Sequence, residues 1–515
     1  MTDSRRHARS SAAGLAGKVS VSVVSAVVLI ALMTVFVCYR PWMGLVDDAG
    51  GAAAGAYDVS TERIEQYCPG RMALKDSDSY GDSEFQASSG NITSSARYAA
   101  LGSVYMSSVT PMADADAEAD AEAERLSDGD DADAIAVLSG AVDDGPTLFD
   151  TRLTASEDGT GAAGSVASWA TDGDLRGVAA ATCVVPSLSQ SFMLPATATG
   201  TTQELVVSNP SDRATAVTMR VWGSSDGEAI SLTTGNTLTV DAHGESSVDL
   251  AAAASGQDGL FVTLDSDETP VAAVVRMTRM DGLNPQGIDY ITPVSQSSSD
   301  AVIPSVRERD AVRVTVRAEE SASVTVSWLT AQGTTAADEG QLDAGRMTMF
   351  DLGEAPEHTL GVVIESDAAV NAMAFAERGG DDGQSDFTVA LPGTAAAASA
   401  VAVPSDTRGE LTVANVSGER TSVTMHAYDA DGRHVGERQI DLEDGAAVDL
   451  AVTDLGEDAA VIMVDDPSES VVWGVRLSQP DVDESGLAGL TNLQTTALTP
   501  VQETVLSQSD RAVIR

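Results

Sequence analysis

TAVTMRVWGSSDG, residues 215–227, contains the pattern from which the fold class can be predicted. Its apolar residues Val217, Met219 and Val221 alternate with polar ones. A period of two is the pattern of a β-strand with one buried face. The Asp-Gly pair at the end of the stretch predicts a tight turn, because glycine tolerates positive φ. The segment therefore predicts one strand of an antiparallel hairpin.

The same segment recurs along the chain at a period of about 100 residues. SASVTVSW at residues 321–328 and TSVTMHAY at 421–428 match it, and other blocks recur around them in the same order. Related joins, VVPS, VIPS and AVPS, end at Ser187, Ser305 and Ser405. Several blocks in constant order predict three tandem modules.

The repeats predict a mainly β fold. About seven short strands per repeat, without a strong amphipathic helix, are typical of an immunoglobulin-like antiparallel β-sandwich. We expect three such β-sandwich repeats in a row, at residues 184–303, 304–403 and 404–515. Residues 57–183 predict a divergent, β-rich amino-terminal domain. Its acidic stretch 113–134 predicts a disordered insertion, because densely spaced like charges repel one another. A calcium-binding loop is not expected there, since DADAEAD lacks the glycine turn and the distal carboxylate of such a loop.

The apolar run VSVSVVSAVVLIALMTVFVCY, residues 19–39, contains no charged residue. A transmembrane helix of that length spans roughly 30 Å, the thickness of the hydrocarbon core of a bilayer. The preceding tail, residues 1–18, is basic, so the positive-inside rule predicts a cytoplasmic amino terminus and an extracytoplasmic remainder. The run is longer than the apolar core of a signal peptide, which favours an uncleaved anchor. Residues 40–56 read as a Gly/Ala-rich linker.

The composition is strongly acidic: 78 Asp and Glu against 29 Lys and Arg give a formal net charge of −49. Such a surface repels phosphates and anionic lipid headgroups, so nucleic acid is excluded as a partner class. Aromatic residues make up only 4 % of the chain, which suits thin β layers better than a deep aromatic pocket.

The chain has three cysteines. Cys38 lies in the apolar run, which leaves Cys68 and Cys183 as an even pair in an oxidising compartment. We expect these two to form a disulfide.

Catalytic motifs are weak. Residues 223–227 fit G-x-S-x-G, but a nucleophile elbow needs a helix after its strand, whereas a hairpin turn is expected here. The remaining candidates for metal or acid-base chemistry are four scattered histidines: His243, His358, His426 and His434. They form no close pair in the sequence, so we expect no catalytic site, no metal site and no cofactor.

GVAAATCVVPS at residues 177–187 and ELVVSNPSDRATAVTMRVWGSSDG at 204–227 resemble a family of actinobacterial membrane-anchored exported proteins of unknown function with repeated β-sandwich modules. Members of that family share a basic tail, one helix, a paired-cysteine join and N-P-x-x-x-x-A-x-V-T modules. The resemblance implies a role in the cell envelope of high-GC Gram-positive bacteria. It implies no catalytic residue.

These observations predict a non-catalytic, single-pass protein of the cell membrane whose extracytoplasmic modules act as a scaffold or interaction protein of the cell envelope. Its expected partners are envelope proteins or cell-wall glycans. The alternative is a cell-wall glycan-binding adhesin or an enzyme accessory module, with Trp473 as a possible ligand contact at the surface. Trp222, Trp328 and Tyr428 are equivalent in the repeats, which favours a core role for them.

Overall fold

The computed structural model describes residues 55–60, 62–74, 87–114, 124–126, 135–232, 235–499 and 502–507. The predicted tail and transmembrane helix, most of the linker and most of the acidic stretch lie outside the described residues. Strands make up 58 % of the structure and helices 4 %, so the fold is mainly β, as predicted. Within the described part of the chain, no helix has the length and apolar character needed to cross a membrane.

The chain divides into two compact units. The smaller one combines Met1–Ser60 with Gln502–Arg515, and in it β1 (Gly55–Ser60) pairs antiparallel with β34 (Gln502–Ser507). The larger unit is Thr61–Val501 and holds all other described strands. The prediction had placed β34 in the last repeat, but its partner strand lies at the other end of the described chain.

The larger unit consists of four modules, each built from antiparallel strands. The strands of module 1 are β2 (Arg63–Cys68), β3 (Thr93–Leu101), β4 (Val104–Pro111), β5 (Glu124–Arg125), β6 (Ala136–Gly140), β7 (Thr147–Leu153), β8 (Gly161–Ala170) and β9 (Gly177–Thr182). Those of module 2 are β10 (Ser189–Pro195), β11 (Thr201–Asn209), β12 (Thr215–Trp222), β13 (Thr237–Val240), β14 (Gly244–Asp249), β15 (Gly259–Ser266), β16 (Ala272–Asp281) and β17 (Asn284–Ile291).

Modules 3 and 4 complete the larger unit. The strands of module 3 are β18 (Ser298–Pro304), β19 (Ala311–Ala318), β20 (Ala322–Thr330), β21 (Gly333–Leu342), β22 (Thr348–Glu354), β23 (Gly361–Gly379) and β24 (Ser385–Ala390). Those of module 4 are β25 (Ala398–Ala402), β26 (Arg408–Asn415), β27 (Thr421–Tyr428), β28 (His434–Leu442), β29 (Ala447–Ala451), β30 (Val461–Asp465), β31 (Val471–Ser478), β32 (Thr491–Gln494) and β33 (Thr496–Ala497). Short helical turns link some of them: η2 (Met112–Asp114), α3 (Leu250–Ala253), η3 (Asp381–Gly383), η4 (Val452–Asp454) and α4 (Pro480–Glu484).

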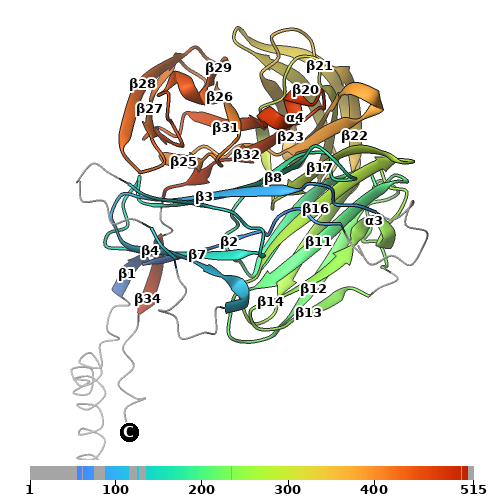
Figure 1. Cartoon of the computed structure of the whole chain (residues 1–515). Helices are drawn as coiled ribbons and strands as arrows, with labels where there is room; N and C mark the ends of the chain where they lie inside the picture. The colour runs from blue at the N-terminus through green and yellow to red at the C-terminus, as the bar shows by residue number, and fades with distance from the viewer. Residues whose placement is uncertain are drawn as a thin grey trace, which may run out of the picture. The chain divides into compact units, whose positions relative to one another are not determined.

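All four modules share one strand order. In module 2 one sheet has the order β10-β15-β12-β13 and the other β14-β11-β16-β17, and modules 1 and 4 repeat this arrangement. In module 3 the sixth and seventh strands are fused into the long β23, whose first half pairs with β18 and β20 and whose second half pairs with β19 and β24. Figure 1 shows the antiparallel strands, for example β11 beside β16 and β27 beside β28.

Module 1 is thus a fourth copy of the repeated topology, where the sequence indicated only a divergent β-rich domain. The reason lies in its burial pattern. All ten residues of β8 are buried, because one face packs in the core of module 1 and the other against module 4. A strand that is covered on both faces has no polar-apolar alternation, so its period cannot be recognised in the sequence.

The first strands of modules 3 and 4 begin six residues before the starts of the predicted repeats, residues 304 and 404. β18 pairs with β23, and β25 pairs with β30, so each belongs to the module that follows it. The recurring VIPS and AVPS blocks therefore mark the end of the first strand of a module and not the end of the preceding module. Inside module 2 the alternation of β12 is as predicted: Val217, Met219 and Val221 are buried in the shared core of the two sheets.

The modules pack in a closed cycle of apolar contacts. Tyr67 joins module 1 to Val206 of module 2, and the core of module 2 continues into Phe375 of module 3. Leu329 joins module 3 to Val472 of module 4. Alanine-rich strands join module 4 back to module 1. The expectation of modules in a row is therefore wrong, because the fourth module covers a face of the first.

Candidate functional site

One strand near the end of each module, β9, β17, β24 and β32 respectively, packs against the others. They bring two carboxylates into the interior of the larger unit: Asp289 on β17 and Asp386 on β24, which are 1 % and 0 % exposed. Buried carboxylates are costly unless they are hydrogen-bonded, so their partners define what this junction does.

Asp386 accepts four hydrogen bonds from backbone N–H groups, one from each module. Its Oδ2 atom accepts from Val178 of module 1 at 2.8 Å and Leu490 of module 4 at 3.0 Å. Its Oδ1 atom accepts from Ile288 of module 2 at 3.1 Å and from Phe387 of its own strand at 3.0 Å. An N–H group can only donate, so this geometry fits an ionised carboxylate. Burial raises the pKa of Asp386 well above the usual carboxyl value, and the N–H donors act in the opposite direction.

Two glycines allow the chain to approach this carboxylate closely. Gly177 at the start of β9 has a φ of 137°, and Gly287 in β17 has a φ of 104°. A Cβ atom at Gly177 would lie 2.8 Å from the carboxylate carbon of Asp386, and one at Gly287 would overlap its Oδ1 atom. Only glycine fits both the backbone angle and the space.

Asp289 joins three modules in a second set of contacts. Its Oδ2 atom accepts from the Thr388 hydroxyl at 3.0 Å and from the Val389 N–H at 2.9 Å, both on β24. Its Oδ1 atom accepts from the Thr491 hydroxyl of β32 at 2.8 Å and from the Tyr290 N–H at 3.0 Å. The hydroxyls can also accept, so a neutral Asp289 keeps its partners. Burial raises the pKa of Asp289 from 3.8 to about 7.

This raised pKa links the stability of the fold to pH. Below the unfolded pKa both states carry the proton, and between about pH 4 and pH 7 only the folded state binds it. The free energy of unfolding therefore falls as pH rises through that window. The full span corresponds to an upper limit of about 4 kcal/mol, since one pKa unit is worth about 1.4 kcal/mol.

Buried arginine side chains form hydrogen bonds across two of the interfaces between modules. Arg476 of module 4 donates to both carboxylate oxygens of Asp310 in module 3, at 2.6 and 3.1 Å. Asp310 is completely buried, and Arg378 adds a third contact at 2.7 Å. Arg97 of module 1 donates to the carbonyl oxygen of Val403, at the start of module 4, at 2.6 Å. These contacts join modules by charge-assisted hydrogen bonds.

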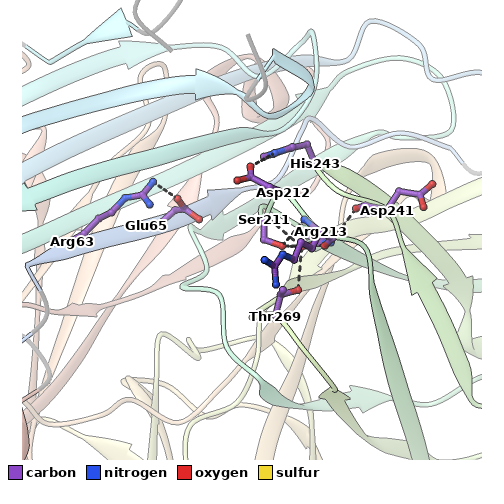
Figure 2. Close-up of polar contacts among 9 residues, drawn as sticks. Arg63, Glu65, Ser211, Asp212, Arg213, Asp241, His243 and Thr269 are labelled. Atoms are coloured by element: carbon purple, nitrogen blue, oxygen red, sulfur yellow. Dashed lines mark hydrogen bonds and ion pairs between the residues drawn. The ribbon is translucent and has the colours of Figure 1, made fainter. Parts of the chain in front are cut away.

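A polar turn lies where module 2 approaches β2 of module 1. Figure 2 shows His243 beside Asp212, with Nε2 to Oδ1 at 2.9 Å, and the pair Arg63 and Glu65 on β2. In the same turn, Asn209 Nδ2 donates to the Arg213 carbonyl oxygen at 2.6 Å. The equivalent Asn415 of module 4 makes the same kind of bond to Glu419, also at 2.6 Å. These residues stabilise turns and form no catalytic arrangement.

The structure also places the residues that the sequence analysis singled out. Cys68 and Cys183 form a disulfide with an S–S distance of 1.97 Å in the core of module 1. Trp473 is 2 % exposed and its indole N–H donates to the Ser399 hydroxyl, so the prediction that it lies on the surface is wrong. One face of β31 packs in the core of module 4 and the other against module 3. The sequence alone does not show that both faces are covered. Ser225 of the G-x-S-x-G stretch donates to the Gln257 side-chain oxygen, which is no base.

Two histidines of module 4 that are eight residues apart in the sequence come together across a hairpin. The imidazoles of His426 and His434 lie 5.9 Å apart between centroids, and Glu437 is next to them. Sequence spacing gave no close pair, because their proximity depends on the pairing of β27 with β28. Of the other two, His243 contacts Asp212, and His358 occupies an exposed turn.

A cavity of about 770 Å³ lies where the connections between modules meet. Its described lining consists of apolar residues, Cys183, and residues with hydroxyl and amide groups such as Ser191, Gln190, Asn371 and Gln494. None of these lining residues is Asp, Glu, His, Lys or Arg. The cavity can therefore offer hydrogen bonds but no acid or base.

The geometry defines a class: antiparallel β modules that pack in a closed cycle and share a buried carboxylate joint. The chain belongs to a family of unknown function, DUF5719, whose model matches residues 137–453, from module 1 into module 4. No curated protein matches the chain.

Two solved structures show a weak similarity to the chain. One is a glycosyl hydrolase family 2 member from Bacteroides cellulosilyticus, with 7 % identity, 66 % of this chain and 36 % of that chain covered, and a TM-score of 0.10. The other is dimeric latent PorU from Porphyromonas gingivalis, with 11 % identity, 67 % and 32 % covered, and a TM-score of 0.12. The chain thus spans about a third of each of these proteins. At such TM-scores neither similarity supports an inference.

Proposed function

We propose that this protein is a non-catalytic scaffold or interaction protein of the bacterial cell envelope, built from immunoglobulin-like modules. The observation that carries the proposal is the joint at Asp386, where one carboxylate uses all its acceptor positions on N–H groups of four modules. A joint of this kind holds several module surfaces in constant relative positions. Fixed surfaces are what a scaffold offers to its partners.

The proposal includes a membrane anchor at residues 19–39 with the amino terminus in the cytoplasm. It rests on the uncharged apolar run and the basic tail before it. Protease added to intact cells should degrade the modules and spare only the tail and the anchor. Modules that stay protected until the cells are lysed would contradict this orientation.

The described lining of the 770 Å³ cavity contains no ionisable side chain. General acid-base and nucleophilic catalysis need a titratable group within hydrogen-bond reach of the substrate. The same lining favours a second candidate function, binding of an uncharged, hydroxyl-rich ligand such as a cell-wall glycan. Its hydroxyls and amides suit such a ligand.

A two-armed binding experiment distinguishes these functions. The full-length protein in detergent is immobilised and exposed separately to solubilised envelope proteins and to cell-wall glycans. Saturable capture of a defined envelope protein, weakened in Asp386→Asn but not in the exposed control Asp338→Asn, supports the scaffold. Saturable glycan binding without protein capture supports the second candidate. Time-dependent release of products from either preparation would overturn both.

A further inference from the structure

The β27–β28 hairpin of module 4 places His426 directly opposite Glu437. On β27 the neighbours Met425 and Ala427 are buried in the core. Side chains alternate along a strand, so His426 and Glu437 stand on the outer face of the sheet. Their side chains are 24 % and 60 % exposed, and His426 Nδ1 lies 3.7 Å from Glu437 Oε2.

His434 reaches the same face because of an irregularity in the ladder. It is three residues before Glu437, and strict alternation would direct it to the opposite face. The register shifts next to Tyr428, which pairs with His434 and leaves Val435 as the additional residue of a bulge. Tyr428 is two residues from His426 and shares its face, so His434 joins that face too. Bulges of this kind re-aim side chains.

We propose that His426, His434 and Glu437 bind a divalent transition-metal ion of the Zn²⁺ type. Their ligand atoms all lie within 4.8 Å of one another. Two imidazoles and one carboxylate suit zinc and its neighbours, whereas calcium and magnesium prefer oxygen ligands alone.

The three side chains need little movement to close on an ion. With metal–ligand bonds of about 2.0 to 2.1 Å, tetrahedral ligand atoms are roughly 3.4 Å apart. His426 and Glu437 are already near that separation, and His434 is exposed and can rotate. The ring of Tyr428 packs edge-on against His434 at 5.5 Å, which limits the positions of the imidazole. Three protein ligands leave one position for water or for a group of a partner.

This site goes beyond the proposed scaffold function and does not depend on it. It would cross-link the two strands of an exposed hairpin and provide a coordination position at the surface of module 4. The sequence carries no signal for it, because neither the spacing of eight between the histidines nor the bulge is a metal-binding pattern.

Titration of the full-length protein with zinc chloride tests the proposal. After treatment with a chelator, calorimetry should show one equivalent bound with a defined affinity. His434→Ala and Glu437→Gln should each weaken that affinity at least about tenfold, because each removes a ligand. Two matched controls should retain it: Asp441→Asn on the same face of β28, and His358→Asn, where asparagine tolerates the φ of 67°.

Cobalt provides a second readout that separates coordination from weak attraction to the acidic surface. Co²⁺ bound to the three ligands should give visible absorption bands, which His426→Ala should abolish and zinc should compete away. Zinc affinity that is unchanged in all three ligand variants, or the lack of a stoichiometric binding phase, would overturn the proposal. Circular dichroism of each variant verifies that the modules remain folded.

Discussion

Replacing Asp386 by asparagine tests whether its carboxylate joins the four modules. Asparagine has nearly the same shape but retains a single acceptor oxygen. Its amide NH₂ group would face two of the N–H donors that now bind the carboxylate, either those of Val178 and Leu490 or those of Ile288 and Phe387. Donors would then oppose donors in a site without solvent.

The structure sets the size of the effect. Each buried N–H group left without an acceptor costs about 1 to 3 kcal/mol, so two of them cost about 2 to 6 kcal/mol. The substitution also removes the cost of burying a charged carboxylate, the same cost that raises the pKa of Asp386, and this offsets part of the loss. We expect Asp386→Asn to lower the free energy of unfolding by about 3 kcal/mol.

Urea unfolding of the full-length protein, followed by tryptophan fluorescence, measures this loss. The control Asp338→Asn lies on the exposed β21 and should change stability by less than about 0.5 kcal/mol. Hydrogen exchange should accelerate at Val178, Ile288 and Leu490, which belong to three different modules. A loss below about 1 kcal/mol, or faster exchange confined to module 3, would show that the Asp386 carboxylate does not join the modules.

Three further predictions follow from the other contacts. Asp289→Asn should reduce the decline in stability between about pH 4 and pH 7, measured as the urea midpoint at each pH. If the midpoint still falls as steeply with pH, another group titrates in that range. Cys183→Ser should destabilise the protein by up to about 4 to 5 kcal/mol, because the disulfide closes a loop of 115 residues. Reduction of the disulfide in the wild type should lower its Tm to about that of the variant. Arg476→Ala should lower the free energy of unfolding by about 3 to 5 kcal/mol, because it leaves Asp310 buried without its bidentate partner. Arg378 is 40 % exposed, so Arg378→Ala should lower it by about 1 kcal/mol or less in the same urea assay.

The sequence contains a faint signal of the buried joint. Asp289 and Asp386 each stand in an apolar strand directly before an aromatic residue, in the segments IDYI and SDFT one repeat apart. An acid in the middle of a buried strand must have partners, because an unpaired buried charge is too costly. The identity of those partners could not be predicted, since Val178 and Leu490 contribute only their backbone N–H groups.

The bulge in module 4 shows a different limit. The alternation in TSVTMHAY correctly directs Met425 to the core and His426 outward. The same rule applied to His434 gives the wrong face, because a single additional residue in the ladder reverses every side chain beyond it.

The mainly β class, the recurrence of the modules and the direction of side chains within strands such as β12 could all be predicted from the sequence. These properties depend on residues that are only a few positions apart. The alternation of a strand and the glycine of a turn can therefore be recognised in the sequence. The contact of module 4 with module 1, the burial of Trp473 and the joining of four modules by Asp386 could be seen only in the folded protein. Those outcomes depend on surfaces a hundred or more residues apart, whose fit is set by packing and hydrogen-bond geometry and leaves no period in the sequence.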